Sequence, residues 1–177
     1  MHKRNQHMKK IAGRLLLAVL AVCCSLVSLA QVPTDSLPRD PGRISVYAVQ
    51  NMSFGTIYQG SAGGTVSLST SGTRTVTGDV VAITQGGTAY PAIFEIEAAS
   101  GTVITIQNGA NATLSGSNGG TMSLQLGASS PASPFTVTTT PPGRTQVSIG
   151  GTLTVGNTNT SKAGSYNGSF NIIFFQQ

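Results

Sequence analysis

The chain lacks tryptophan and has only two cysteines, two histidines and 8% charged residues. The histidines (His2, His7) and cysteines (Cys23, Cys24) all fall within the first 24 residues. Without that segment no imidazole or thiol remains, which excludes Ser-His and Cys-His nucleophiles. It also excludes zinc or copper sites built on those ligands, and any disulfide. We therefore expect a non-catalytic protein that needs no cofactor.

The first 30 residues have the three parts of a secretory signal peptide. Residues 1–14 carry five basic side chains and no acidic one, and an apolar run follows at 15–27. The small residues Ser28 and Ala30 stand where a signal peptidase cleaves. The 13-residue run is shorter than the roughly 20 residues that span a bilayer. We predict a cleaved leader over 1–30, a mature form without a membrane span, and export to the periplasm, outer surface or extracellular space. An uncleaved anchor and a lipoprotein are the alternatives.

Loss of the leader also removes the excess of positive charge. The full chain has a formal net charge of +5, and five of its ten basic residues lie in the leader. Residues 31–177 keep five basic and five acidic residues: Arg39, Arg43, Arg74, Arg144 and Lys162 against Asp35, Asp40, Asp79, Glu95 and Glu97. Such a neutral chain offers no basic surface for a nucleic acid, so we expect no nucleic-acid partner.

The remainder divides into a short arm and one domain. Residues 31–42 contain Pro33, Pro38 and Pro41, which predicts an extended arm, because proline suits neither helices nor inner strands. Ser36, in an Asp-Ser-Leu sequence, is a candidate for O-glycosylation. From residue 43 to residue 177 we expect a single domain.

Apolar and polar residues alternate along residues 43–177, which is typical of strands with one buried face. Glycine pairs separate the runs, and Asn108-Gly109 is a hairpin-type signal. Together they predict an all-β, antiparallel sandwich. The apolar sets are Ile44, Val46, Ala48; Val66, Leu68; Phe94, Ile96, Ala98; Ile104, Ile106; Met122, Leu124, Leu126; Phe135, Val137; Val147, Ile149; Leu153, Val155; and Tyr166, Phe170, Ile172, Phe174. The predicted breaks are Gly63-Gly64, Gly86-Gly87, Gly119-Gly120 and Gly150-Gly151.

Several short segments, in order, resemble one family of bacterial secreted domains, the domain of unknown function 4402. The resemblance runs from about Ile44 to the end of the chain. It is carried by residues 51–57, 63–66, Arg74 with 78–80, 92–94, 150–155 and 163–170. That family is similar to pilin and spore-coat subunits, so the resemblance implies an exported, immunoglobulin-like and pilin-like sandwich. Gly164 is the fourteenth residue from the end, as in chaperone–usher pilins, but Gln176 replaces their penultimate tyrosine.

The resemblance leads us to expect a surface structural subunit that assembles by strand pairing with itself or related subunits. In strand addition, an extended segment pairs with an open sheet edge. Ile44, Val46 and Ala48 are the candidate donor residues, although residues 43–49 can equally form the first strand of their own sheet. On the receiving side, the candidates are Gly164, Tyr166, Phe170, Ile172 and Phe174, on a long C-terminal strand expected inside a completed sheet.

The alternative is a monomeric adhesin or carbohydrate-binding module with a glycan as partner. Tyr58 and Tyr90, expected in loops, would then contact the ligand, because an amphipathic ring suits a wet surface. Glu95 and Glu97 share one face of a predicted strand. We interpret them as its solvated side. The alternatives are a glycosidase pair and a weak calcium site that uses either Asp79 or these two glutamates.

Overall fold

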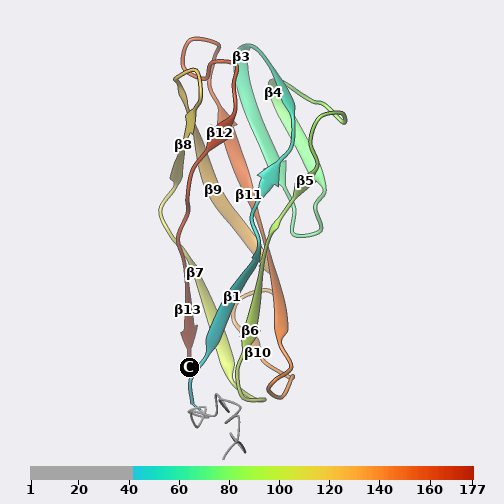
Figure 1. Ribbon diagram of the computed structural model, residues 1–177, viewed down its shortest axis with the longest axis vertical. Coiled ribbons are helices and arrows are strands. Elements are labelled where there is room, and N and C mark those ends of the chain that lie inside the picture. Colours follow the sequence, from blue (N-terminus) through green and yellow to red (C-terminus); the bar gives the residue numbers. More distant parts are fainter. Residues whose placement is uncertain (1–41) are drawn as a thin grey trace, which may run out of the picture. The chain divides into compact units, whose positions relative to one another are not determined.

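The computed structural model describes residues 42–177, which lie in one unit, Asp40–Gln177, and form strands, turns and loops (Figure 1). Every strand pairing in this part is antiparallel, which confirms the all-β prediction. The predicted leader and nearly all of the predicted arm lie outside the described residues. Among the residues described, no helix is long and apolar enough to cross a membrane.

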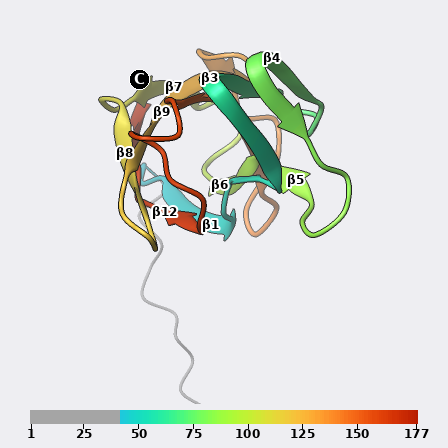
Figure 2. The same ribbon diagram turned by 90° about the horizontal axis from the view of Figure 1, so that it is seen from above.

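Eight strands form a large sheet around the long strand β11. The order is β1-β6-β11-β9-β8-β12, and β3 pairs with both β11 and β4. Seen from above, β3, β9, β8 and β12 follow a curve (Figure 2). The bounds are β1 Ser45–Gln50, β3 Ile57–Leu68, β4 Arg74–Ala82, β6 Ala92–Glu97, β8 Ala112–Gly116, β9 Thr121–Ser130, β11 Thr145–Val155 and β12 Tyr166–Asn167.

Two smaller sheets complete the fold. One has the order β10-β7-β13, and the other pairs β2 with β5. The rings of Phe94 in β6 and Phe174 in β13 lie 5.5 Å apart, so the three-stranded sheet packs against the large one. The bounds are β2 Ser53–Phe54, β5 Ala89–Tyr90, β7 Val103–Asn108, β10 Phe135–Thr136 and β13 Ile172–Gln176.

Most of the hydrophobic core consists of the alternating residues that the sequence singled out, joined by Phe54 and Val80. Each such side chain contributes about 1.5–3 kcal/mol when it is fully buried. The buried members include Val66, Leu68, Ile96, Ala98, Ile104, Met122, Leu124, Leu126, Val137, Val147, Ile149, Leu153 and Val155. The period-two pattern therefore predicted the inward face of most strands correctly. The prediction fails for β1, where Val46 and Ala48 are exposed.

Two of the four predicted glycine breaks are wrong. Gly63-Gly64 lies inside β3 and Gly150-Gly151 inside β11, each at a shift in pairing register. A β-bulge uses glycine as a turn does, because both need unusual dihedral angles or close backbone approach. Gly86-Gly87 and Gly119-Gly120 do lie between strands.

Asn108-Gly109 does not form a hairpin, and the C-terminal strand is not continuous. β7 and β13 pair in the small sheet, whereas the adjoining β8 and β12 belong to the large one. The segment between β7 and β8 and the segment between β12 and β13 therefore both cross from one sheet to the other. They do so side by side, because the Gly109 amide donates to the Asn171 carbonyl at 2.9 Å. The Asn108 side chain also donates to the Gly127 carbonyl, at 2.8 Å. This crossing divides the expected strand Tyr166–Phe175 into β12 and β13.

Candidate functional site

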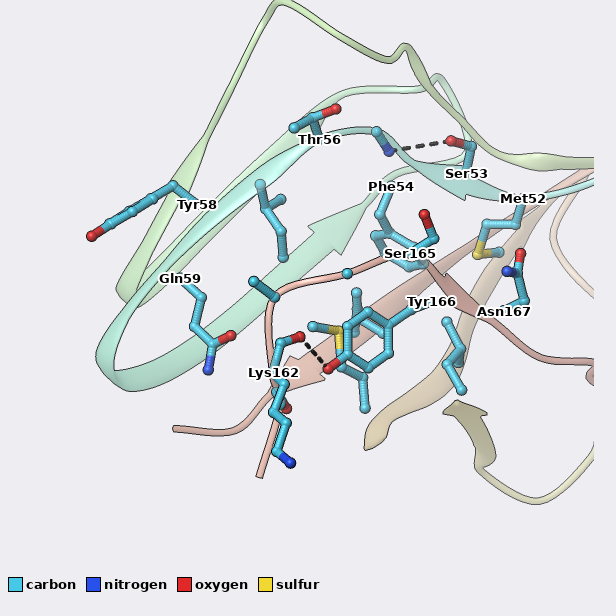
Figure 3. A pocket seen from close by; sticks show the side chains of 18 of the residues that line it. Met52, Ser53, Phe54, Thr56, Tyr58, Gln59, Lys162, Ser165, Tyr166 and Asn167 are labelled. Carbon is cyan, nitrogen blue, oxygen red and sulfur yellow. Dashed lines mark hydrogen bonds between the residues drawn. The ribbon is translucent and has the colours of Figure 1, made fainter. Parts of the chain in front are cut away.

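A cavity of about 730 Å³ lies between residues 52–59 and residues 158–167 (Figure 3). Leu114, Met122 and Leu153 contribute apolar surface from β8, β9 and β11. Phe54 and Tyr166 line it from β2 and β12. β2 pairs only with β5, and β12 only with β8, among the described strands. The cavity thus lies where the curved sheet is not closed.

Hydrogen bonds to the main chain position one wall of this cavity. The Tyr166 hydroxyl donates to the Lys162 carbonyl at 2.6 Å. The fully buried Ser161 hydroxyl donates to the Thr121 carbonyl at 2.7 Å and accepts from the Gly156 amide at 3.0 Å. Ser161 therefore anchors the loop after β11 to β9.

Arg74 positions the opposite wall. Its Nη1 donates to the carbonyls of Phe54 at 2.7 Å and Thr56 at 3.0 Å, and its Nη2 to that of Ile83 at 2.8 Å. These bonds join the bend between β2 and β3 to the end of β4. We had not predicted this role, although Arg74 is the only charged residue between Arg43 and Asp79.

The cavity is suited to binding through apolar contacts and neutral polar groups. Of the described residues that line it, Lys162 is the only charged one. Within residues 42–177, no group of three or more His, Cys, Asp or Glu side chains is placed to hold a metal ion.

Tyr58 and Tyr90 both line this cavity, but they lie on strands β3 and β5 rather than in loops. Their side chains are well exposed, at 63% for Tyr58 and 39% for Tyr90. Figure 3 shows Tyr58 extending away from Tyr166. The structure therefore brings the two predicted ligand contacts to one rim.

The candidate donor segment forms a strand of its own sheet. In β1, Val46 lies opposite Ile96 and Ala48 opposite Phe94 of β6. Ile44, just before β1, is half-buried and packs against the core. β6 is the only strand paired with β1 in the part of the chain that is described. The other side of β1 is therefore a sheet edge.

The candidate receiving residues fall in two separate places. Gly164 and Tyr166 line the cavity. Phe170 lies between β12 and β13, while Ile172 and Phe174 belong to β13, and all three are half-buried against the core.

The strand β13 is an edge strand of its sheet, and the expected inner position would require a further strand to complete that sheet. β7 is its only paired neighbour within the described range. Its outward residues Ile173 and Phe175 are 50% and 44% exposed. In the sequence, Ile172 and Phe174 alternate with Ile173 and Phe175, so the strand has two apolar faces, but this pattern does not tell which strands lie beside it.

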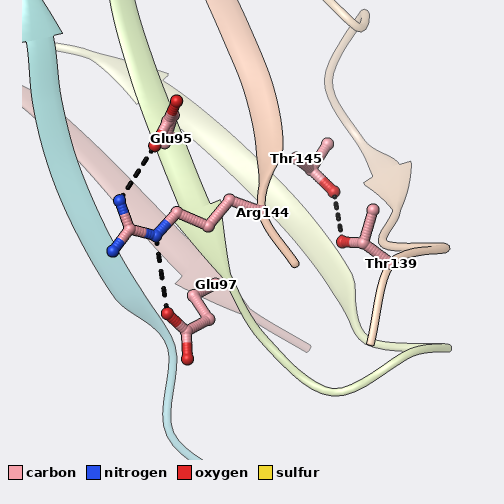
Figure 4. A network of polar contacts seen from close by, with 5 residues as sticks. All are labelled: Glu95, Glu97, Thr139, Arg144 and Thr145. Atoms are coloured by element: carbon pink, nitrogen blue, oxygen red, sulfur yellow. Dashed lines mark hydrogen bonds and ion pairs between the residues drawn. The ribbon is translucent and has the colours of Figure 1, made fainter. Parts of the chain in front are cut away.

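The prediction that Glu97 lies on a solvated face of β6 is wrong, because its side chain is only 5% exposed. Arg144 lies beside both acids, with Nη1 3.0 Å from Glu95 and Nε 3.5 Å from Glu97 (Figure 4). Its guanidinium also stacks 3.9 Å from the centre of the Tyr47 ring. The hydrogen bond to Glu95 is the main cause that raises the pKa of Arg144 above its ordinary value. The two acids of β6 therefore pair with a cation that lies just before β11 and stacks on a ring of β1.

Residues 44–174 match the model of the family described as "Domain of unknown function (DUF4402)". No curated protein and no solved structure matches the chain significantly.

Proposed function

Since the chain belongs to the family of domain of unknown function 4402, we propose a function from its strand edges. It acts as a non-catalytic, exported structural subunit of the cell surface, with an immunoglobulin-like, pilin-like fold. It assembles with copies of itself or related subunits by β-strand pairing. No cofactor takes part, because main-chain hydrogen bonds supply the contact.

The observation that carries this proposal is the edge of β13, with which no described strand other than β7 pairs. Natural proteins usually protect edge strands with charge, proline, a bulge or a covering segment. β13, with the sequence Ile-Ile-Phe-Phe-Gln, has neither charge nor proline, and its pairing with β7 shows no register shift. Such an edge favours pairing with another strand.

β1 supplies a second open edge. It carries no charged residue, and Tyr47 and Val49 are 36% and 55% exposed. A subunit needs two contact surfaces to build an assembly larger than a closed dimer. The edges of β1 and β13 supply these two surfaces.

Light scattering after size-exclusion chromatography tests this function. The wild-type protein is expected to form particles larger than a dimer, and Val49→Lys to reduce their mass by placing a charge on the β1 edge. Gln125→Lys is the control, because Gln125 is exposed on the inner strand β9. The test uses point variants because removal of the whole of β1 would also uncover β6. A wild-type protein that stays monomeric at high concentration contradicts the proposal.

A second candidate is a monomeric adhesin or carbohydrate-binding module. It is favoured by the position of Tyr58 and Tyr90 at the rim of one cavity. Exposed aromatic rings offer an apolar surface on which a sugar can pack. Glycan-array binding by a monomer, lost in both Tyr58→Ala and Tyr90→Ala, would support this function instead.

A further inference from the structure

We propose that β13 pairs antiparallel with β13 of a second copy, about a twofold axis at Phe174. This inference rests on the strand-pairing function proposed above and specifies one of its contacts. The two three-stranded sheets then join into one sheet with the order β10-β7-β13-β13-β7-β10.

The two faces of β13 have different surroundings, and this limits how it can pair. Ile172 and Phe174 pack against the core, and the Phe174 ring contacts Phe94. Ile173 and Phe175 are about half exposed. Directly opposite residues of an antiparallel pair point to the same face, so each outward residue must meet an outward residue of the partner.

In only one symmetric register do all five residues of β13 lie opposite a residue of the partner's β13. With Phe174 opposite Phe174 of the second copy, Ile173 lies opposite Phe175 at two equivalent places. Ile172 then lies opposite Gln176. A register centred on Ile173 would instead place Phe175 opposite Asn171, which lies outside the strand. In the register centred on Phe174, Ile173 of each copy packs against Phe175 of the other. The two exposed hydrophobic side chains of each copy are therefore buried in two equivalent aromatic–β-branched pairs.

The chemistry of the edge fits a second copy better than a charged partner. β13 has no charged side chain with which such a partner could form an ion pair. Gln107 and Thr105 of β7 lie opposite Ile173 and Phe175, so the two apolar side chains have neutral neighbours on that face. A twofold contact is also the commonest interface in homo-oligomers.

Disulfide trapping tests the register. Ile173→Cys and Phe175→Cys are made separately in the full chain, with Cys23 and Cys24 replaced by serine. Opposite Cα atoms lie about 4.5–5.5 Å apart, whereas diagonal ones lie about 7–8 Å apart. Because a disulfide rarely forms beyond about 7 Å, an equal mixture of the variants should cross-link at least about fivefold faster than either alone. Val81→Cys, exposed on the edge strand β4, is the control and should not cross-link.

Charge exchange tests the same register without oxidation. Ile173→Lys alone places a charge opposite Phe175 and should abolish the β13 contact. The double variant Ile173→Lys/Phe175→Glu places opposite charges against each other twice and should restore it. The readout is the particle mass by light scattering, in parallel with circular dichroism to verify folding.

The outcomes separate this inference from the proposed function. Preferential cross-links between positions 173 and 175, and rescue by the double variant, support the twofold contact. Large particles without these cross-links, or with cross-links that form as fast in either variant alone as in the mixture, overturn the twofold contact but leave strand assembly in place. A monomeric wild-type protein overturns both.

Discussion

At the residue scale, Arg74 shows how a single cation can join separate parts of a fold that has few charged residues. Its guanidinium donates to three main-chain carbonyls that come from two separate parts of the chain. The planar fork of arginine makes several such bonds at once, which the compact ammonium of lysine does not reproduce. The bend that carries Phe54 and Thr56 into the cavity wall thus depends on one side chain.

Replacement of Arg74 should therefore destabilise the protein. We expect Arg74→Met to lower the free energy of unfolding by about 2–4 kcal/mol, because carbonyls that lose a charged donor are costly to leave unpaired. Urea denaturation followed by circular dichroism measures the loss. Arg43→Met removes an exposed guanidinium and should change stability by less than about 0.5 kcal/mol. Equal effects of the two substitutions would show that the three hydrogen bonds contribute little.

At the element scale, the bulges in β3 and β11 allow long strands to follow the curve of the large sheet. Gly63 has φ +75°, and a Cβ there would collide with the carbonyl oxygens of Val155 and Gly156. β3 and β11 approach closely at this point, since Gly64 pairs with Val155. Glycine is required here for both backbone conformation and space.

A matched pair of alanine substitutions separates these two requirements. Gly101 has φ +91° but nothing within 4 Å of an added Cβ, so Gly101→Ala should cost about 1–2 kcal/mol from the dihedral angle alone. Gly63→Ala should cost about 1–3 kcal/mol more, because the collision with β11 adds to it. Thermal unfolding of both variants gives the difference. A Gly63→Ala protein as stable as Gly101→Ala would mean that β11 shifts freely.

At the scale of the whole molecule, β11 connects two parts of the large sheet. Thr145–Ile149 pair with β6, and Gly151–Val155 pair with β3. On the other side, β9 pairs with the end of the first segment, Ser148 and Ile149, and with residues 151–154 of the second. One continuous strand therefore links the region that packs on the three-stranded sheet with the region that lines the cavity.

This connection predicts one cooperative unfolding transition. Ile149→Ala and Leu153→Ala remove buried side chains from the two segments of β11, and each should cost about 2–5 kcal/mol. Because the segments share a strand, calorimetry should show a single transition at a lower temperature in each variant. Two separate transitions, one unchanged by each substitution, would mean that the two regions unfold independently.

The sequence alone determined the strand class and most inward residues, because alternation along a strand is a local property that sets which side chains are buried together. It also indicated the family before the fold was known. The leader and the export route stay predictions, since they concern residues outside the described range.

Tertiary structure alone decided the features that join distant segments. Arg144 reaches Glu95 across 49 positions, and it also lies 3.5 Å from the buried Glu97. The cavity joins residues 52–59 to residues 158–167. Whether β13 is an inner or an edge strand depends on which strands lie beside it. Periodicity along one strand identifies its apolar faces but carries no information on the neighbours that cover them.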